Sequence, residues 1–182
     1  MGKIRNRRMT MKIGVISDTH DNVPKIEAAV RHFNNAGVDA VLHCGDFVAP
    51  FALLPFKELK PKLYLVYGNN DGEKKGLRAL AAEHGWTLGD MPMEVELGGR
   101  KIVMLHEPDR VEGLRRAARH DLILYGHTHK PRASHDGGRL TLNPGEGGGW
   151  LSGKATVATV DLKTLAAEFH EIGDLDEMPA AL

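Results

Sequence analysis

Oxygen and imidazole side chains stand directly after five apolar stretches of this chain, where predicted strands end. The five segments are VISDTHDN, LHCGDF, VYGNND, VMLHEP and LYGHTHK, and the side chains are Asp18, His20, Asp46, Asn69, His106, His127 and His129. Histidine offers borderline nitrogen ligands, whereas carboxylates and amides offer hard oxygen ligands. This mixture suits manganese, iron, nickel or zinc better than calcium, so the set predicts a transition-metal site.

Each segment by itself has a plainer interpretation. An Asp-Thr-His or Gly-Asp after a strand is most often a cap or a turn, and a lone histidine usually lies on the surface or in the core. His43, three residues before Asp46, is expected to pack within its strand, with a supporting role at the site as the alternative. The plainer interpretation is also adopted for His32, His84, His120, His135 and His170.

The apolar stretches alternate with helical patterns through the first two thirds of the chain. Strands are predicted at residues 12–17, 39–44, 62–68 and 120–126, and helices at 24–37, 50–59, 74–85 and 109–120. This order predicts parallel strands with helical crossovers. The carboxyl ends of such strands are where α/β proteins bind ligands, so the polar side chains are expected to converge there.

Beyond residue 93 the pattern changes to hairpins. MEVELGGRKIVML (93–105) reads as two strands joined by a Gly-Gly turn, and a second hairpin is predicted at 130–145. Two alternating tail strands are predicted at 154–162 and 164–172, with a glycine-rich loop at 145–153 before them. The predicted architecture is therefore α/β, with two sheets that face each other and helices at their flanks.

Size and composition restrict the alternatives. The 182 residues suit one domain, predicted to span residues 11–182. With 24 basic and 24 acidic residues the chain is formally neutral, which disfavours a general affinity for nucleic acid or an anionic membrane. The single cysteine, Cys44, excludes an intramolecular disulfide and fits a reducing compartment, so the cytoplasm is expected.

The first ten residues form a basic segment, MGKIRNRRMT. No long apolar stretch follows it, so it lacks the hydrophobic region of a signal peptide, and no run in the chain approaches transmembrane length. A disordered extension or an upstream start codon is expected, with a small basic arm for a polyanion as the alternative.

The ordered set of motifs resembles the calcineurin-like metallophosphoesterase superfamily, in particular its small bacterial and archaeal phosphodiesterases. The resemblance covers about residues 11–172, and NPGE at 143–146 adds to it. Its motifs are Asp18-x-His20, Gly45-Asp46, Gly68-Asn69-Asn70-Asp71, His106 and Gly126-His127-Thr128-His129. Each motif is weak alone, and the ordered set is specific.

The resemblance implies a sandwich of two mixed sheets with two divalent metal ions at one rim, manganese being the favoured activator among Mn, Ni, Fe and Zn. By its pattern, Asp18, His20 and His129 would hold the first ion, Asn69, His106 and His127 would hold the second, and Asp46 would bridge both. A hydroxide shared by the ions would attack phosphorus in line, and the expected substrate is a small phosphodiester or nucleotide.

Two positions depart from the pattern. Many relatives carry histidine where this chain has Asn70, and that histidine is thought to protonate the leaving oxygen. An amide cannot do so, and general acid assistance is typically worth about a hundred- to ten-thousand-fold in rate, so good leaving groups should be strongly preferred. Glu107 stands where glycine commonly follows the histidine of the fourth motif; it could orient His106, donate a proton, or face solvent, which is the expected case.

Three other classes of function fit the sequence less well. A retromer subunit resembles these enzymes yet serves as an interaction scaffold, but such relatives tend to lose ligand histidines and this chain keeps all seven candidate ligands. A nuclease is disfavoured because aromatic residues are only 5% of the chain and no basic run lies beside the motifs. A dinucleotide oxidoreductase lacks its glycine motif. Apolar residues around Trp150 and in the hairpins could form a homodimer face or could equally pack inside.

Overall fold

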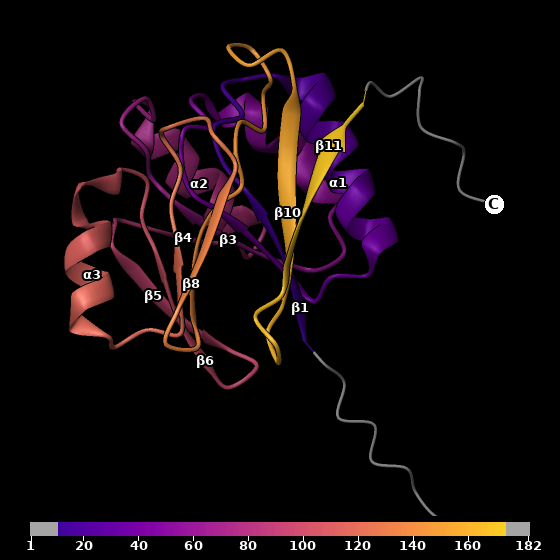
Figure 1. Cartoon of the computed structure of the whole chain (residues 1–182). Helices are drawn as coiled ribbons and strands as arrows, with labels where there is room; N and C mark the ends of the chain where they lie inside the picture. The colour runs from indigo at the N-terminus through magenta and orange to yellow at the C-terminus, as the bar shows by residue number, and fades with distance from the viewer. Residues whose placement is uncertain (1–10, 174–182) are drawn as a thin grey trace, which may run out of the picture.

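Two β-sheets face each other in the computed structural model, which describes residues 11–173, and helices cover their outer sides (Figure 1). This confirms the predicted sandwich of two mixed sheets with flanking helices. The basic segment at residues 1–10 lies outside the described residues, as do residues 174–182. Within the part of the chain that the structure describes, no helix is both long and apolar enough to cross a membrane.

The first sheet combines three parallel crossovers with an antiparallel tail. In chain order its strands are β1 (Lys12–Ile16), β2 (Ala40–His43), β3 (Lys62–Val66), β4 (Thr87–Gly89), β10 (Ala155–Asp161) and β11 (Ala167–Ile172). They lie in the order β11-β10-β1-β2-β3-β4, with β1 to β4 parallel and with β10 antiparallel to both of its neighbours. The short strand β4 was not predicted, because three residues are too few to show a period.

The second sheet contains both predicted hairpins. Its strands are β5 (Met93–Leu97), β6 (Arg100–Met104), β7 (Leu122–Leu124), β8 (Arg132–Asp136) and β9 (Arg139–Asn143). Their order is β5-β6-β7-β9-β8, in which β6, β7 and β9 are parallel and each hairpin is antiparallel. The strand predicted at 120–126 thus belongs to this sheet and not to the one formed by β1 to β3.

Helices α1 (Val23–Ala36), α2 (Lys74–Glu83) and α3 (Val111–Ala117) follow the predicted patterns, with two differences. The segment predicted as a helix at 50–59 is a 3-10 helix, η1 (Pro50–Glu58). Pro55 inside it lacks an N–H group and would clash with the preceding α-helical turn. The helix predicted at 109–120 is shorter than expected, because its first turn is the 3-10 helix η2 (Pro108–Arg110) and Ala118 ends it in a left-handed conformation.

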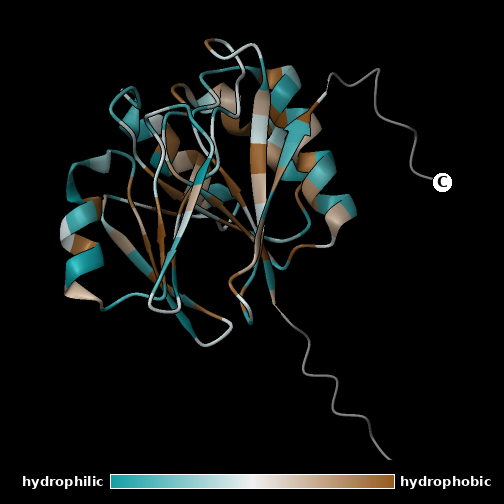
Figure 2. Cartoon of the chain, viewed as in Figure 1, coloured by the Kyte–Doolittle hydropathy of each residue, from teal (hydrophilic) through white to brown (hydrophobic). Residues whose placement is uncertain are grey.

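Apolar residues are concentrated on the strands of both sheets (Figure 2), and their buried side chains form separate layers of the core. The inner layer includes Ile13, Val15, Leu42 and Val66 from the first sheet and Ile102, Met104, Leu124 and Leu142 from the second. A second layer lies under α1 and η1, where Phe33 packs so closely that a Cβ on Gly14 would come within 2.6 Å of its ring. Each fully buried Leu, Ile or Phe contributes about 1.5–3 kcal/mol, so these layers hold the strand ends in place.

Candidate metal centre

The seven predicted ligands come together at one edge of the sandwich, although they are spread over much of the chain. They follow β1 (Asp18, His20), β2 (Asp46), β3 (Asn69), β6 (His106) and β7 (His127, His129). Because β1, β2 and β3 are parallel, as are β6 and β7, the loops after these strands lie at the same edge. Contacts between the two sets of loops join both sheets at this site.

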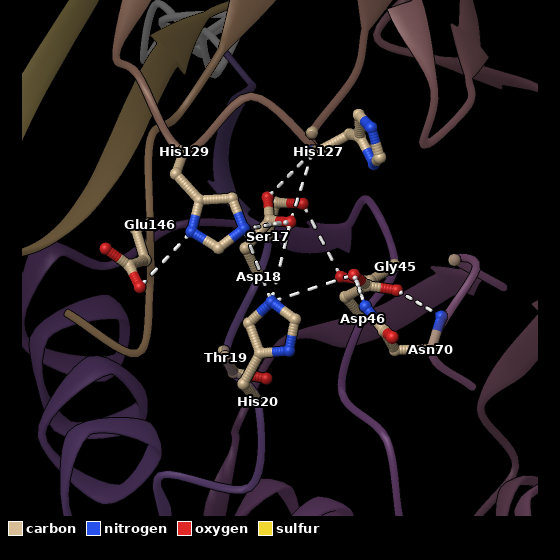
Figure 3. A network of polar contacts seen from close by, with 12 residues as sticks. Ser17, Asp18, Thr19, His20, Gly45, Asp46, Asn70, His127, His129 and Glu146 are labelled. Carbon is tan, nitrogen blue, oxygen red and sulfur yellow. Dashed lines mark hydrogen bonds and ion pairs between the residues drawn. The ribbon is translucent and has the colours of Figure 1, made fainter. Parts of the chain in front are cut away.

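Asp18, His20 and His129 form the first group of this centre, with ligand atoms that all lie within 4.8 Å of one another. Nε2 of His129 lies 3.4 Å from Oδ1 of Asp18 and 3.4 Å from Nε2 of His20 (Figure 3). Nε2 of His20 also lies 3.6 Å from Oδ2 of Asp46. Imidazole nitrogens and carboxylate oxygens that face a common point are an arrangement typical of metal ligands.

Asn69, His106 and His127 form the second group. Oδ1 of Asn69 lies 3.0 Å from Nε2 of His106 and 3.0 Å from Nδ1 of His127. Nε2 of His106 is in turn 3.3 Å from Oδ2 of Asp46. Asp46 therefore contacts a histidine of each group, which is the position that the resemblance assigned to a shared carboxylate.

The backbone is strained where it presents these ligands. Left-handed φ angles are rare for residues other than glycine and cost on the order of 1–3 kcal/mol each. Five of the seven candidate ligands have them: Asp18 (55°), His20 (40°), Asp46 (58°), His127 (68°) and His129 (57°). Such a concentration is characteristic of functional sites, because the surrounding fold must impose it.

Contacts at Nδ1 orient the rings of two candidate ligand histidines. Nδ1 of His106 lies 2.8 Å from the carbonyl oxygen of Cys44, which can only accept, so Nδ1 carries the proton. Nδ1 of His129 faces Oε1 of Glu146 at 3.2 Å. In both rings Nε2 points into the centre, where it can bind a cation once it carries no proton.

Two buried side chains hold the loops that carry the ligands. Asp71 accepts hydrogen bonds from the N–H groups of Gly68, Asp46 and Val48, at 2.6, 3.0 and 2.6 Å, and so holds the loops after β2 and β3 together. His43 is fully buried; its Nδ1 accepts from the N–H of Gly45, so its Nε2–H faces Oγ1 of Thr19. Both ring nitrogens of His43 therefore bind the loops that carry the candidate ligands. This is the supporting role that the sequence offered as the alternative to packing within the strand.

Glu146 contacts the candidate site in a way that the sequence did not reveal. It is fully buried, and besides facing His129 it accepts hydrogen bonds from the N–H groups of Leu151 and Ser152 and from the Ser152 hydroxyl. Burial by itself would raise its pKa, but these hydrogen bonds outweigh burial and hold the pKa below its usual value. The motif NPGE pointed to this residue, yet its contact with His129 exists only in the folded chain.

The two positions that depart from the family pattern behave differently. Asn70 donates from Nδ2 to Oδ2 of Asp46 at 2.7 Å, and its backbone N–H donates to Oδ1 at 2.9 Å, so it fixes the shared carboxylate. Glu107 is half-buried, and its side chain makes no hydrogen bond or ion pair with any residue in 11–173. It therefore does not orient His106, whose Nδ1 contacts Cys44 instead.

The charges of the site indicate that a cation belongs there. Asp18 and Asp46 are almost completely buried, and every ion pair that either makes within residues 11–173 is with a histidine. Burial raises the pKa of Asp18, whereas hydrogen bonds from His106 and Asn70 outweigh burial at Asp46 and hold its pKa well below the usual range. Burial by itself would lower the pKa of His106. The carboxylates of Asp46 and Asp18 have the larger, opposite effect, so the pKa of His106 lies above its usual value. Buried carboxylates without lysine or arginine partners fit metal ligation.

Comparison with known proteins agrees with this chemistry. The model of the calcineurin-like phosphoesterase superfamily domain matches residues 11–165, so the chain belongs to this superfamily of phosphoric ester hydrolases, as the sequence predicted. It is 36% identical over 168 residues to the phosphodiesterase MJ0936 of Methanocaldococcus jannaschii, covering 89% of this chain and 98% of that protein.

Solved structures of phosphoesterases have the same fold as this chain. A structure of an archaeal phosphodiesterase superposes with a TM-score of 0.84 at 33% identity, over 88% of this chain and 99% of that one. The phosphoesterase YfcE of E. coli superposes with a TM-score of 0.60 at 19% identity, over 90% of this chain and all of that one, which supports the fold alone.

Proposed function

We propose that this protein hydrolyses small phosphodiesters with the help of two divalent transition-metal ions, manganese being the preferred activator. The observation that carries the proposal is the convergence of seven candidate ligands around two buried carboxylates whose only charged partners, among the described residues, are histidines. The 36% identity to a phosphodiesterase supports the choice of a diester substrate.

The residues divide the work in a way that the geometry supports. Asp18, His20 and His129 would hold one ion, Asn69, His106 and His127 the other, with Asp46 between them. When bound, such ions supply a nucleophile from water near neutral pH and positive charge that stabilises the phosphoryl oxygens. Asp18 also accepts the backbone N–H of His127 at 3.1 and 3.0 Å, which connects the two groups.

Charge and composition favour small substrates. Two divalent ions against two ligand carboxylates leave a local positive charge, which attracts a phosphate anion although the whole chain is formally neutral. A nucleic acid strand would need a basic groove and stacking side chains, whereas only 5% of residues are aromatic. The single, buried Cys44 fits the reducing cytoplasm, which we propose as the location.

The test uses the full-length chain, stripped of metal by a chelator and then supplied with manganese, nickel, zinc, iron(II) or magnesium. We expect hydrolysis of bis(4-nitrophenyl) phosphate to disappear on chelation, to return most strongly with manganese, and to be abolished by His127→Ala. His135→Ala is the matched control, because His135 is exposed on β8 and lies outside both ligand groups. Hydrolysis that survives chelation and His127→Ala would overturn the proposal.

The same preparation distinguishes an enzyme from an interaction scaffold. Elemental analysis should find close to two transition-metal ions per wild-type chain after reconstitution. A chain that binds metal but hydrolyses no phosphomonoester, diester or nucleotide in a substrate panel would support the scaffold.

A further inference from the structure

An exposed indole lies next to the candidate metal centre, and an exposed leucine follows it in the chain. Trp150 is 64% exposed and Leu151 is 80% exposed, the highest values among the large apolar residues that the structure describes. Both lie in the segment between β9 and β10, which also contains Glu146. Single exposed apolar residues are ordinary, but an adjacent pair beside a polar site calls for a ligand-binding explanation.

The indole of Trp150 is fixed against the loop that supplies two ligands. Its Nε1–H donates to the carbonyl oxygen of His20 at 3.0 Å. The imidazole of the same His20 lies 3.4 Å from Nε2 of His129, in the first group of the centre. The indole therefore contacts the backbone of a candidate ligand. Its only polar atom is already hydrogen-bonded, and most of its surface is exposed to solvent.

The segment that carries the indole is itself held in place at several points. The N–H groups of Gly147 and Gly148 donate to the carbonyl oxygens of Ser17 and Asp18, at 2.7 and 2.9 Å. Nδ2 of Asn22 donates to the oxygen of Gly148 at 2.7 Å. A Cβ on Gly147 or Gly148 would come within 2.8 or 2.6 Å of the backbone after β1, so these glycines are what allows the close approach.

Glu146 also holds the segment that carries Trp150. It is buried, accepts the N–H groups of Leu151 and Ser152 at 2.8 Å each, and faces His129 with the same carboxylate. The apolar pair is thus connected to the first group through both His20 and His129. A surface that is held this firmly loses little entropy when it binds a ligand.

We propose that Trp150, flanked by Leu151, binds the organic substituent of the substrate and selects flat aromatic or nucleobase groups. This inference rests on the proposed function, because it places the phosphate at the metal centre. A phosphate ester bound there must extend its organic substituent away from phosphorus. The exposed indole of Trp150, which is hydrogen-bonded to the loop of His20, offers that substituent a large apolar surface. Stacking of a base on an aromatic ring is worth about 1–3 kcal/mol, or roughly five- to 150-fold in affinity.

Calorimetric binding tests this through affinity and not through catalytic rate. Adenosine 5′-monophosphate, 4-nitrophenyl phosphate, ribose 5-phosphate and inorganic phosphate are titrated into manganese-loaded protein. We expect Trp150→Ala to weaken the two aromatic probes about tenfold while phosphate and ribose 5-phosphate keep their affinities, and Trp150→Phe to restore most of the loss. Phe169→Ala is the matched control, because Phe169 is an exposed aromatic on β11, outside this segment.

A fluorescence titration provides an independent readout. The chain has two tryptophans, so Trp86→Phe leaves Trp150 as the single indole reporter, and its emission should change with adenosine 5′-monophosphate but not with phosphate, in metal-free protein as well. Equal weakening of all four probes by Trp150→Ala, or unchanged affinity for the aromatic pair, would overturn the inference. Probe binding that depends on Trp150 in a protein without hydrolytic activity would instead contradict only the proposed function.

Discussion

The two groups of the metal centre differ in what lies behind their histidines. In the first group, Nδ1 of His129 faces the buried carboxylate of Glu146 at 3.2 Å. In the second, Nδ1 of His106 faces a neutral backbone carbonyl at 2.8 Å, and the exposed His127 contacts Asn69 through its ring. A carboxylate makes an imidazole ligand more basic than a carbonyl does, so the first group should bind its cation more tightly.

The groups also differ in how the chain supports them. The first is attached to the glycine-rich segment after β9, through Glu146 and through backbone hydrogen bonds to Ser17 and Asp18. The second relies on the ends of β2 and β3, held together by Asp71. The comparison therefore predicts two cation affinities that different substitutions can change separately.

The largest effect is expected at the carboxylate that both groups share. Asp46→Asn removes one of the two carboxylates among the candidate ligands, so both cations should bind poorly and kcat/KM for bis(4-nitrophenyl) phosphate should fall by roughly a thousandfold or more. Elemental analysis and steady-state kinetics measure the two quantities. Asp39→Asn is the control, because its exposed carboxylate lies at the opposite end of β2 and accepts the N–H of Lys12. Two ions still bound to Asp46→Asn would contradict the shared role.

The next effect should separate the two groups. Glu146→Gln removes the charge behind His129, so the affinity for one cation should fall about ten- to a hundredfold while the other is unchanged. Competition with a metal indicator measures both affinities. Ser152→Ala is the matched control: it deletes a hydrogen bond to the Glu146 carboxylate but keeps its charge. An equal fall in both affinities would show that the groups are not independent.

The difference between the groups also marks the limit of sequence reasoning. The seven candidate ligands could be found because each follows an apolar strand. The apolar pattern and the polar residue after it are neighbours in the sequence, so no knowledge of the fold is needed to see them. Glu146 lies 17 positions after His129, and only the parallel pairing of β7 with β9 brings the two together. The strand β4 was missed because it has three residues, and the α-helix predicted at 50–59 became a 3-10 helix around Pro55.

A smaller effect is expected at Asn70, which approaches Asp46 through its side chain and backbone. Asn70→Ala deletes one hydrogen bond to a charged group, so rates should fall about tenfold, and by the same factor for every substrate. Plots of rate against leaving-group pKa, for a series of aryl diesters, should be steep and parallel for both proteins, because an amide cannot protonate the leaving oxygen. A steeper plot for Asn70→Ala would show that Asn70 assists the leaving group. Asn34→Ala, on the far part of α1, is the control.

The smallest effect on the metal centre should come from His43, which supports its loops without facing either group. Burial lowers the pKa of this ring from 6.5 to about 3. The folded chain keeps the ring neutral, whereas the unfolded chain protonates it below its ordinary pKa. The free energy of unfolding should therefore fall as the pH drops from 6.5 towards 3, with a slope that approaches about 1.4 kcal/mol per pH unit from this ring.

His43→Asn tests this contribution, because asparagine does not titrate and can still accept the N–H of Gly45. The variant should be less stable at pH 7, since a smaller side chain leaves space beside Phe47 and Phe56, but it should lose less stability between pH 7 and 5. Urea unfolding at pH 7, 6 and 5 gives both slopes, with the exposed His135→Asn as the matched control. Equal slopes for His43→Asn and the wild type would place the acid sensitivity elsewhere, and the buried carboxylates of the metal centre would then be the next groups to vary.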